Sequence, residues 1–292
     1  MDFFVPLILS GVAMGAIYGL VALGFVLLIN AVNIINIAQG EFLMLGSFFV
    51  FAFAVTWQVP MGVALAGTLV AASLVGIVFE RIAYRPLRGG DIATFIVSTL
   101  AASMVIQNVA LNTWGPYPFA FRWPFEGLIL TPGNLRVNPQ HLLILGVTAA
   151  LMVALYLFFF RTRTGKMMRA MSQDKPTARL LGIPVAFIST LTFVIAACIG
   201  AVAGVLVAPV FFVNIEVGFM IGLKAFIATI IGGWGSIPGA IAGGIVLGLV
   251  EVLAAAFISS QYKDAFAFLF LILFLLIRPE GIFGEVGTVE KA

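Results

Sequence analysis

Long apolar runs that follow one another along almost the whole chain constrain its fold more than any other feature. The chain has 292 residues, of which 62% are hydrophobic and 9% are charged. Soluble proteins carry about a quarter charged residues, so this chain could not present a hydrated surface. Runs of roughly twenty apolar residues match helices that cross a hydrocarbon core about 30 Å thick. The alternating segments of a membrane β-barrel are not seen. The sequence therefore predicts an all-α, polytopic membrane protein.

Nine apolar runs could each provide a membrane segment, and eight to nine segments are predicted. The runs span residues 7–29, 41–55, 60–79, 92–113, 141–160, 185–207, 217–234, 239–257 and 265–277. Polar or glycine-rich stretches interrupt the regions 33–55 and 217–234, so discontinuous or re-entrant helices are expected there. No loop is long enough to hold a soluble domain, and residues 1–292 are therefore expected to form a single transmembrane domain.

The distribution of basic residues predicts the orientation of the chain. Residues 81–90 carry three Lys or Arg, residues 161–184 carry six and residues 278–292 carry two. An even number of predicted segments separates each of these regions from the next, so all three share one face. Basic residues collect in cytoplasmic loops, and this face is therefore expected to be cytoplasmic. The amino terminus is then expected outside and the carboxyl terminus inside.

The region 161–184 is the longest polar stretch between apolar runs, and its residues predict two short helices. Lys166–Ser172 has a helical pattern, and Asp174 can cap a second helix that has Pro176 in its first turn. Gly182 provides a stop signal after it. The apolar side of these helices would consist of Met167, Met168, Met171, Ala178, Leu180 and Leu181. Such an element could rest on anionic lipid or insert into a groove of a protein, and its capping favours the protein partner.

A polar interruption after the first apolar run is the strongest signal at membrane depth. It contains Asn33, Asn36, Gln39, Gly40 and Glu41 within nine residues. Amides and a carboxylate inside a membrane are costly unless they meet polar partners or water. One interpretation is a discontinuous helix that lines a polar path. The other is a cytoplasmic turn held by hydrogen bonds between helices, and the sequence supports both equally.

Two more stretches contribute candidate residues for a polar path. Gln107 and Asn108 form a polar patch within the run 92–113, and a glycine-rich stretch contains Gly232, Gly233, Gly235 and Ser236. Lys224 lies near the start of its apolar run. It either extends to the headgroups, which is the favoured interpretation, or pairs with a buried acid such as Glu251 or Glu41.

Catalysis by this chain is not expected. Ser236 has no base within reach, because the one histidine, His141, lies at the other face of the membrane in the predicted topology. The sequence contains no zinc-protease motif and no phosphate-binding loop, so neither a metal nor a cofactor is expected. The net charge of +3 is concentrated in membrane loops and is not a nucleic-acid signal.

Five stretches resemble the LivH-type inner-membrane permeases of bacterial ABC transporters for branched-chain and related amino acids. They are GAIYGLVALGFVLL at 15–28, NIAQGEFLMLG at 36–46, RTRTGKMMRAMSQDKPTARLLGI at 161–183, KAFIATIIGGWGSIPGAIAGG at 224–244 and LIRPEGIFG at 276–284. The second stretch commonly reads N-F-A-H-G-E in the family, and here Ile37 and Gln39 replace its Phe and His. Any substrate role of that histidine therefore does not carry over.

The resemblance implies a permease subunit in the bacterial inner membrane that imports branched-chain or related amino acids. Its implied partners are a second, related permease in a heterodimer, two ATP-binding subunits that hold ATP and Mg, a periplasmic binding protein, and membrane lipid. It implies that the loop 161–184 couples to an ATPase through Lys166, Arg169, Ala170, Gln173, Asp174, Ala178, Arg179, Leu181 and Gly182. The translocation path is expected to include Asn33, Asn36, Gln39, Gly40, Glu41, Gln107, Asn108, Gly232, Gly233, Gly235 and Ser236.

Two other classes of function are compatible with the residues alone. An ATP-independent channel or secondary carrier for a small polar solute would follow an ion or substrate gradient. A structural membrane subunit would have no path at all. Uptake into vesicles with and without ATP distinguishes the three.

Overall fold

The computed structural model describes residues 4–123 and 139–284, and within them the chain is built from α-helices. The chain divides into two compact units, each assembled from separate stretches. Unit 1 contains residues 1–26, 122–153 and 224–292, and unit 2 contains residues 27–121 and 154–223. Residues 124–138 and the tail beyond Gly284, with part of the predicted loop 114–140 and of the basic region 278–292, lie outside the described residues.

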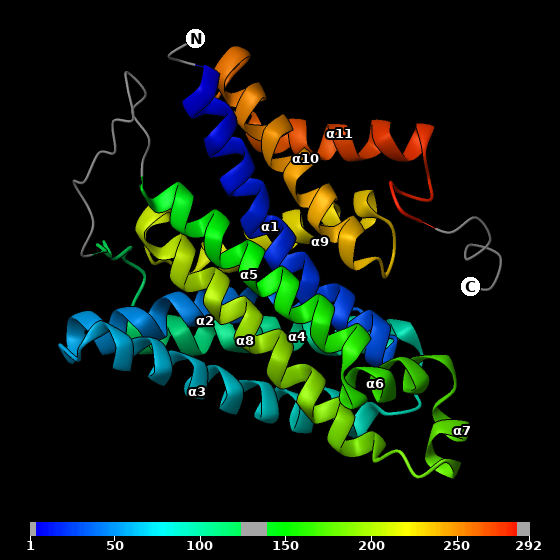
Figure 1. The fold of residues 1–292 in the computed structure, drawn as a ribbon. Coiled ribbons are helices and arrows are strands. Elements are labelled where there is room, and N and C mark those ends of the chain that lie inside the picture. Colours follow the sequence, from blue (N-terminus) through cyan, green and yellow to red (C-terminus); the bar gives the residue numbers. More distant parts are fainter. Residues whose placement is uncertain (1–3, 124–138, 285–292) are drawn as a thin grey trace. The chain divides into compact units, whose positions relative to one another are not determined.

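The described helices follow the predicted apolar runs closely (Figure 1). They are α1 (Phe4–Val32), α2 (Gln39–Phe51), α3 (Met61–Phe79), α4 (Ile92–Trp114), α5 (Pro139–Arg161), α6 (Arg163–Gln173), α7 (Lys175–Leu180), α8 (Val185–Phe211), α9 (Glu216–Gly232), α10 (Ile237–Phe257) and α11 (Lys263–Ile277). Short π-helical and 3-10 turns, η1 (Ala52–Thr56), η2 (Glu80–Tyr84) and η3 (Arg85–Leu87), extend α2 and α3.

Seven helical stretches in the described part of the chain are long and apolar enough to cross a membrane. They are α1, α2 with η1, α3 with its extensions, α4, α5, α8 and α10. The predicted segments 217–234 and 265–277 correspond to α9 and α11, which have only 17 and 15 residues. The all-α, polytopic fold is confirmed, whereas the count of eight to nine segments, the orientation and the single domain stay predictions.

Unit 2 is organised around α8, which packs against α2 and α3, while α4 packs against α2 (Figure 1). Small residues permit this contact. A Cβ atom added to Gly204 of α8 would lie 2.0 Å from the Leu43 carbonyl oxygen, and one added to Gly46 of α2 would lie 2.4 Å from the Ala201 Cα atom. Apolar side chains gain little from leaving lipid for protein, so helices in a membrane associate by such close backbone packing.

In unit 1, small residues likewise let α10 pack closely against the first part of α1. A Cβ atom on Gly244 would lie 2.4 Å from the Gly19 nitrogen, and one on Gly248 would lie 2.3 Å from the Gly15 nitrogen. The helices α9 and α10 form a hairpin, and α11 packs on α10. The segment after α11 returns to this hairpin, where the Ile282 backbone nitrogen donates to the Ile231 carbonyl oxygen.

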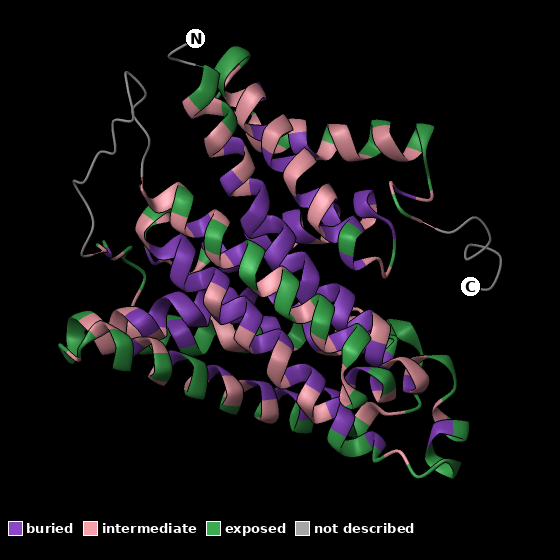
Figure 2. Ribbon diagram, viewed as in Figure 1, coloured by how far each residue is buried: buried purple, intermediate pink, exposed green. Residues whose placement is uncertain are grey.

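The apolar surface of α3 and α4 is consistent with contact to lipid. Figure 2 shows α3 buried along one face only, with exposed residues along the other. Val70 and Leu74 on α3, and Val97 and Met104 on α4, are exposed. Bands of exposed aliphatic side chains on helices of this length are expected where the surrounding solvent is hydrocarbon.

We predict that Gly204→Ala destabilises the protein, because the added methyl group meets the backbone of α2. The expected cost is about 1–3 kcal/mol, since overpacking outweighs the gain in helix propensity. Gly146→Ala in α5 is the matched control, because a Cβ atom there meets nothing within 4 Å. Thermal unfolding of both purified variants in detergent measures the difference. Equal stability of the two variants would contradict this account of the α2–α8 contact.

Candidate functional site

A break between α1 and α2 places polar residues inside the membrane part of unit 2. The chain leaves α1 at Asn33, which has a φ of 55° and therefore cannot continue the helix. Asn is among the few residues that adopt this left-handed conformation readily. The Asn36 side chain accepts a hydrogen bond from the Ala38 nitrogen at 3.1 Å, and the Ile37 nitrogen donates to the Thr99 hydroxyl at 3.1 Å. The non-helical segment is thus held by its own amide and by α4.

Glu41, in the first turn of α2, is 1% exposed and bonded to α4. Its Oε1 atom accepts hydrogen bonds from the Ser103 hydroxyl and from the Gln107 Nε2 atom, both at 2.8 Å. Thr99, Ser103 and Gln107 are spaced by four residues and therefore lie on one face of α4. Ser103 and Gln107 follow Ile92 by 11 and 15 residues, which places them roughly 16–22 Å along the helix. The carboxylate therefore lies near the middle of α4.

The structure places the residues of this polar stretch in two environments, and their expected place in a polar path stays a prediction. Asn33 is exposed at the end of α1, as expected for a turn, whereas Asn36, Gln39, Gly40 and Glu41 are buried. Gly40 allows α9 to approach, because a Cβ atom there would lie 2.1 Å from the Gly218 carbonyl oxygen. The Gln39 Nε2 atom donates to the Ala196 carbonyl oxygen at 3.1 Å.

Three buried polar atoms of this stretch have no hydrogen-bond partner among the described residues. They are Asn36 Nδ2, Gln39 Oε1 and Glu41 Oε2. Buried polar atoms in proteins are nearly always paired, so these three atoms could each form a hydrogen bond with a further polar group. The three residues span only six positions of the chain.

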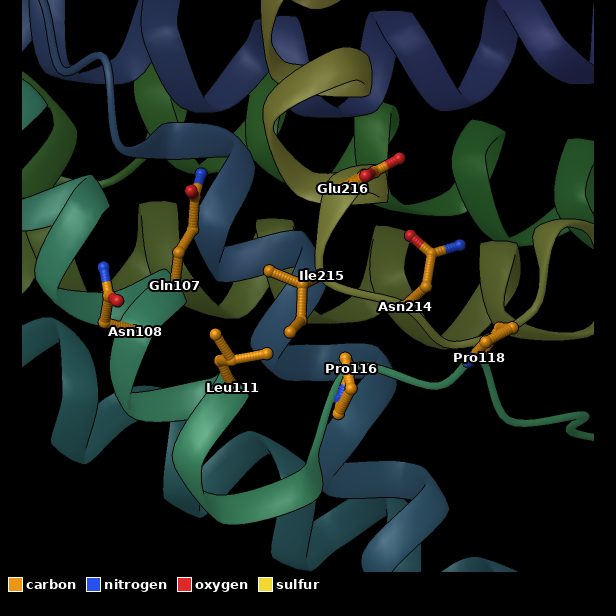
Figure 3. A pocket seen from close by; sticks show the side chains of 8 residues that line it. All are labelled: Gln107, Asn108, Leu111, Pro116, Pro118, Asn214, Ile215 and Glu216. Carbon is orange, nitrogen blue, oxygen red and sulfur yellow. The ribbon is translucent and has the colours of Figure 1, made fainter.

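A cavity of about 550 Å³ opens beside Gln107, and we call it the amide-lined cavity (Figure 3). It is lined by Gln107, Asn108, Leu111, Pro116, Pro118, Asn214, Ile215 and Glu216. Three side-chain amides and one carboxylate thus share it with two aliphatic side chains. Gln107 belongs both to this lining and to the Glu41 group, so it joins the cavity to the buried carboxylate.

The turn between α8 and α9 supplies the far side of the amide-lined cavity. The Asn214 Oδ1 atom accepts a hydrogen bond from the Val217 nitrogen at 3.0 Å and so holds the start of α9. Glu216 lies in the first turn of α9, where the helix dipole stabilises a negative charge. An isolated bridge between Phe119 and Val213 ties this turn to the segment after α4.

The glycine-rich stretch lies in unit 1, and its described contacts are within that unit. Gly233 and Gly235 have φ values of 106° and 77°, which reverse the chain between α9 and α10. Gly232 packs against Gly239, and the Ser236 hydroxyl accepts a hydrogen bond from the Gly239 nitrogen at 3.1 Å. These contacts give the residues a local structural role in the α9–α10 hairpin, and their expected place in the translocation path stays a prediction.

The predicted short helices of the loop 161–184 are confirmed. Thr162 caps α6 by accepting a hydrogen bond from the Gly165 nitrogen, and Asp174 caps α7 by accepting one from the Thr177 nitrogen. The two hydrogen bonds from Thr177 lower the pKa of the exposed Asp174 carboxyl. At the other end of α7, Gly182 has a φ of 79°, and the Ile183 nitrogen donates to the Ala178 carbonyl oxygen. This is a Schellman motif, which satisfies carbonyls at a helix end.

The apolar side chains of this loop divide into a packed set and an exposed set. Met168, Met171 and Ala178 are buried, whereas Leu180 and Leu181 are 87% and 75% exposed. Among the expected coupling residues, the exposed ones are Lys166, Gln173, Asp174, Arg179, Leu181 and Gly182, and Arg169 and Ala170 are half-buried.

Within this loop, Arg169 has a structural contact. Its guanidinium lies over the Phe160 ring, 4.9 Å from the centroid, and a cation held over an aromatic face is stabilised by the ring quadrupole. Ala178 packs inward. Two expected coupling residues thus help to hold the loop on the helix bundle, while the exposed ones around the end of α7 remain accessible.

The interpretation that Lys224 extends to the headgroups is wrong, and its pairing with Glu251 is confirmed. Lys224 is 6% exposed, and its Nζ atom lies 2.7 Å from Glu251 Oε1 and 2.6 Å from Asp264 Oδ1. The Tyr18 hydroxyl donates to Glu251 Oε2 at 2.6 Å. A charge in an apolar interior requires a partner, and α10 and α11 provide two carboxylates. This network ties α1, α9, α10 and α11 together within unit 1.

Comparison with known proteins identifies the family. The model of the branched-chain amino acid transport system permease component matches residues 7–275. The permease protein LivH of the high-affinity branched-chain amino acid transport system of Escherichia coli K12 is 37% identical over 99% of this chain and 98% of its own. The chain belongs to this permease family. The permease is therefore a multi-pass inner-membrane protein.

Two further relatives are also named as permease proteins of branched-chain amino acid transport systems. LivH of Salmonella typhimurium is 36% identical over 99% of this permease and 98% of its own chain. BraD of Pseudomonas aeruginosa, also named as a permease protein of a high-affinity branched-chain amino acid transport system, is 37% identical over 97% of this permease and 96% of its own chain. A solved structure of PsaBC from Streptococcus pneumoniae in complex with Fab has a TM-score of 0.51 at 14% identity, over 97% of this chain and 94% of that chain. That likeness supports the fold alone.

Sequence reasoning missed Ser103, which bonds to Glu41, and most of the lining of the amide-lined cavity: Leu111, Pro116, Pro118, Asn214, Ile215 and Glu216. A signal for Ser103 existed, because it precedes Gln107 by one helical turn on the same face. Asn214 and Glu216 form a polar turn before an apolar run, a pattern that marks many membrane loops and therefore does not identify a cavity.

We predict that Glu251→Leu destabilises the permease by about 3 kcal/mol, because breaking a buried ion pair leaves Lys224 with only the half-exposed Asp264. The double variant Lys224→Met with Glu251→Leu is expected to recover most of the loss, since it removes both charges. Denaturant titration of the purified variants measures both effects. A double variant no more stable than Glu251→Leu would show that the penalty does not come from the unpaired ammonium.

Proposed function

We propose that this permease is a subunit of an ATP-driven ABC importer that moves branched-chain or related amino acids across the inner membrane. The family and the names of its relatives support this class of cargo. The observation that carries the proposal is the amide-lined cavity. Gln107 joins this cavity to the buried Glu41 carboxylate of α2, which lies beside the middle of α4. A polar solute can thus exchange hydrogen bonds with the chain at membrane depth.

The chemistry of the cavity suits a zwitterion with an aliphatic side chain. The Glu216 carboxylate can bind an ammonium group, and the amides of Gln107, Asn108 and Asn214 can donate to a carboxylate. Leu111 shares the lining and offers apolar contact to the side chain. In the next step the unpaired polar atoms around Glu41 would replace hydration as the solute passes α2.

The loop 161–184 is proposed to dock on an ATP-binding subunit. Leu180 and Leu181 project from a helix that is capped at both ends, so the loop presents them in a fixed geometry. The same loop also exposes the charged residues Lys166, Arg179 and Asp174. Exposed leucines and charged side chains on one loop match the apolar centre and polar rim of a protein interface. Closure of the two ATPases would then move this loop and, through its packed methionines, the helices of unit 2.

The remaining partners follow from the same proposal. The importer would contain a second, related permease in a heterodimer, two ATP-binding subunits carrying ATP and Mg, and a periplasmic binding protein that selects the substrate. ATP hydrolysis would occur in the partners and not in this chain.

The proposed orientation places the loop 161–184 in the cytoplasm, with the amino terminus outside and the carboxyl terminus inside. The basic loops 81–90 and 161–184 contribute to one cavity through Arg88, Lys175 and Arg179, which supports a common face for them. The abundance of Lys and Arg in these loops assigns that face to the cytoplasm.

We predict that Asn108→Leu reduces uptake while Asn112→Leu does not. Both amides lie on α4 and donate to the carbonyl four residues earlier, but only Asn108 lines the cavity. Loss of one hydrogen bond to the solute is expected to raise the half-saturating concentration about fivefold. Uptake by the complete transporter in membrane vesicles measures this. Equal effects of the two substitutions would exclude the cavity from the path.

We predict that Leu180→Glu prevents stable association with the ATPases, because a charge replaces an apolar contact at the docking surface. An interface contact of this kind contributes about 2 kcal/mol or more, so association is expected to weaken at least thirtyfold. Co-purification of the ATP-binding subunits is the measurement. Leu180→Met keeps the contact apolar and is the control. Normal co-purification of Leu180→Glu would rule out this docking surface.

Uptake into vesicles with and without internal ATP tests the ATP-driven mechanism directly. The proposal requires uptake that depends on ATP and on the ATP-binding subunits. Uptake by the chain alone, driven only by an ion or substrate gradient, would instead establish a carrier or channel.

A further inference from the structure

A second cavity of unit 2, of about 440 Å³, shares no lining residue with the amide-lined cavity, and we call it the basic cavity. Three cationic residues line it, Arg88 after η3, Lys175 at the start of α7 and Arg179 one turn later. Among the described residues, no carboxylate belongs to the lining. The basic cavity therefore concentrates positive charge from two loops that are far apart in the sequence.

The basic cavity lies at the level where membrane helices begin and end. Asn33 follows the last residue of α1, Arg88 follows the end of the α3 stretch, Ile92 begins α4, and Val185 begins α8. The ends of four apolar spans mark the boundary between hydrocarbon and water, which is the depth of lipid headgroups. Tyr84 adds an aromatic side chain of the kind that is enriched at this boundary.

The positive charges around the basic cavity are incompletely neutralised. The Arg88 guanidinium donates to the buried Glu80 carboxylate, which accounts for one of the three cations. The Lys175 Nζ atom donates to the Val32 carbonyl oxygen at 2.7 Å, a neutral partner. Burial lowers the pKa of the Lys175 ammonium, and repulsion from Arg88 and Arg179 lowers it further.

The nearby acids do not balance this charge. Asp174 accepts hydrogen bonds from the Thr177 side chain and backbone, as the cap of α7. Asp91 is exposed at the start of α4 and does not line the cavity. An anion that entered the cavity would therefore meet two ammonium or guanidinium groups without an ion-pair partner in the lining.

We propose that the basic cavity binds the phosphate of an anionic phospholipid headgroup. Ile92 and Phe95 share the lining with the cations, so the glycerol and the first acyl carbons have an apolar surface beside the phosphate site. Basic pockets between membrane helices at the cytoplasmic face bind such headgroups. The lipid would hold α7 to the ends of α1 and α4 and thereby fix the loop that presents Leu180 and Leu181. This inference goes beyond the proposed function, because it concerns lipid binding by the chain itself.

The test measures lipid retention by the full-length chain, purified without the ATPases because Arg179 is also an expected docking residue. Phosphatidylglycerol or phosphatidylcholine is added in separate arms, and native mass spectrometry and thermal unfolding follow binding. We expect phosphatidylglycerol to be retained and to raise the unfolding temperature, whereas phosphatidylcholine does neither. Arg179→Gln is expected to weaken retention roughly fivefold, the contribution of one basic residue close to an anionic headgroup.

Arg163→Gln is the matched control, because Arg163 is an exposed arginine of the same loop that does not line the cavity. Equal losses from the two substitutions would show a general charge effect and overturn the proposal. The unfolding temperature in phosphatidylcholine confirms that Arg179→Gln folds, and Lys175→Gln provides a second variant. Inorganic phosphate alone forms the last arm. If it protected the chain as well as phosphatidylglycerol does, the site would be one for free phosphate, and the lipid assignment would fail.

Discussion

Backbone polar groups inside a membrane must find partners within the protein, and the break between α1 and α2 depends on how this permease meets that constraint. The Asn33 nitrogen still bonds to α1, through the Ile29 carbonyl oxygen. The Ile37 nitrogen bonds to Thr99 on α4, and the Ala38 nitrogen bonds to the Asn36 side chain. Non-helical backbone at this depth persists only where protein or a polar cavity satisfies it. Asparagine and threonine side chains thus permit the chain to carry a carboxylate into the middle of unit 2.

Close helix packing in both units follows from the hydrocarbon that surrounds the helices. In hydrocarbon, burying apolar side chains gives helices little reason to associate, so backbone contact at small residues holds them. Gly204 against α2 and Gly244 against α1 are examples of this principle in the two units. Gly40 acts in the same way at the candidate site, because it lets α9 pack against the Glu41 turn.

Two ionisable residues inside the membrane, Lys224 and Glu41, have different kinds of partner. Lys224 is neutralised by two carboxylates, and the network that results is structural. Glu41 has only neutral donors, Ser103 and Gln107, and one of its oxygen atoms is unpaired among the described residues. This difference in partners separates Glu41, a residue of the candidate path, from the scaffold around Lys224.

The sequence by itself determined the helical membrane class, the boundaries of most spans and the capped helices of the loop 161–184, because apolar run length, Asp174 and Gly182 act locally. It also indicated that the residues Asn36 to Glu41 are unusual. Only the tertiary structure decided which partners they meet. The bonds from Ser103 to Glu41 and from Lys224 to Asp264 join residues at least 40 positions apart, and their geometry depends on how helices pack. The amide-lined cavity and the basic cavity depend on this packing too, since each is lined by residues from segments that lie far apart in the sequence.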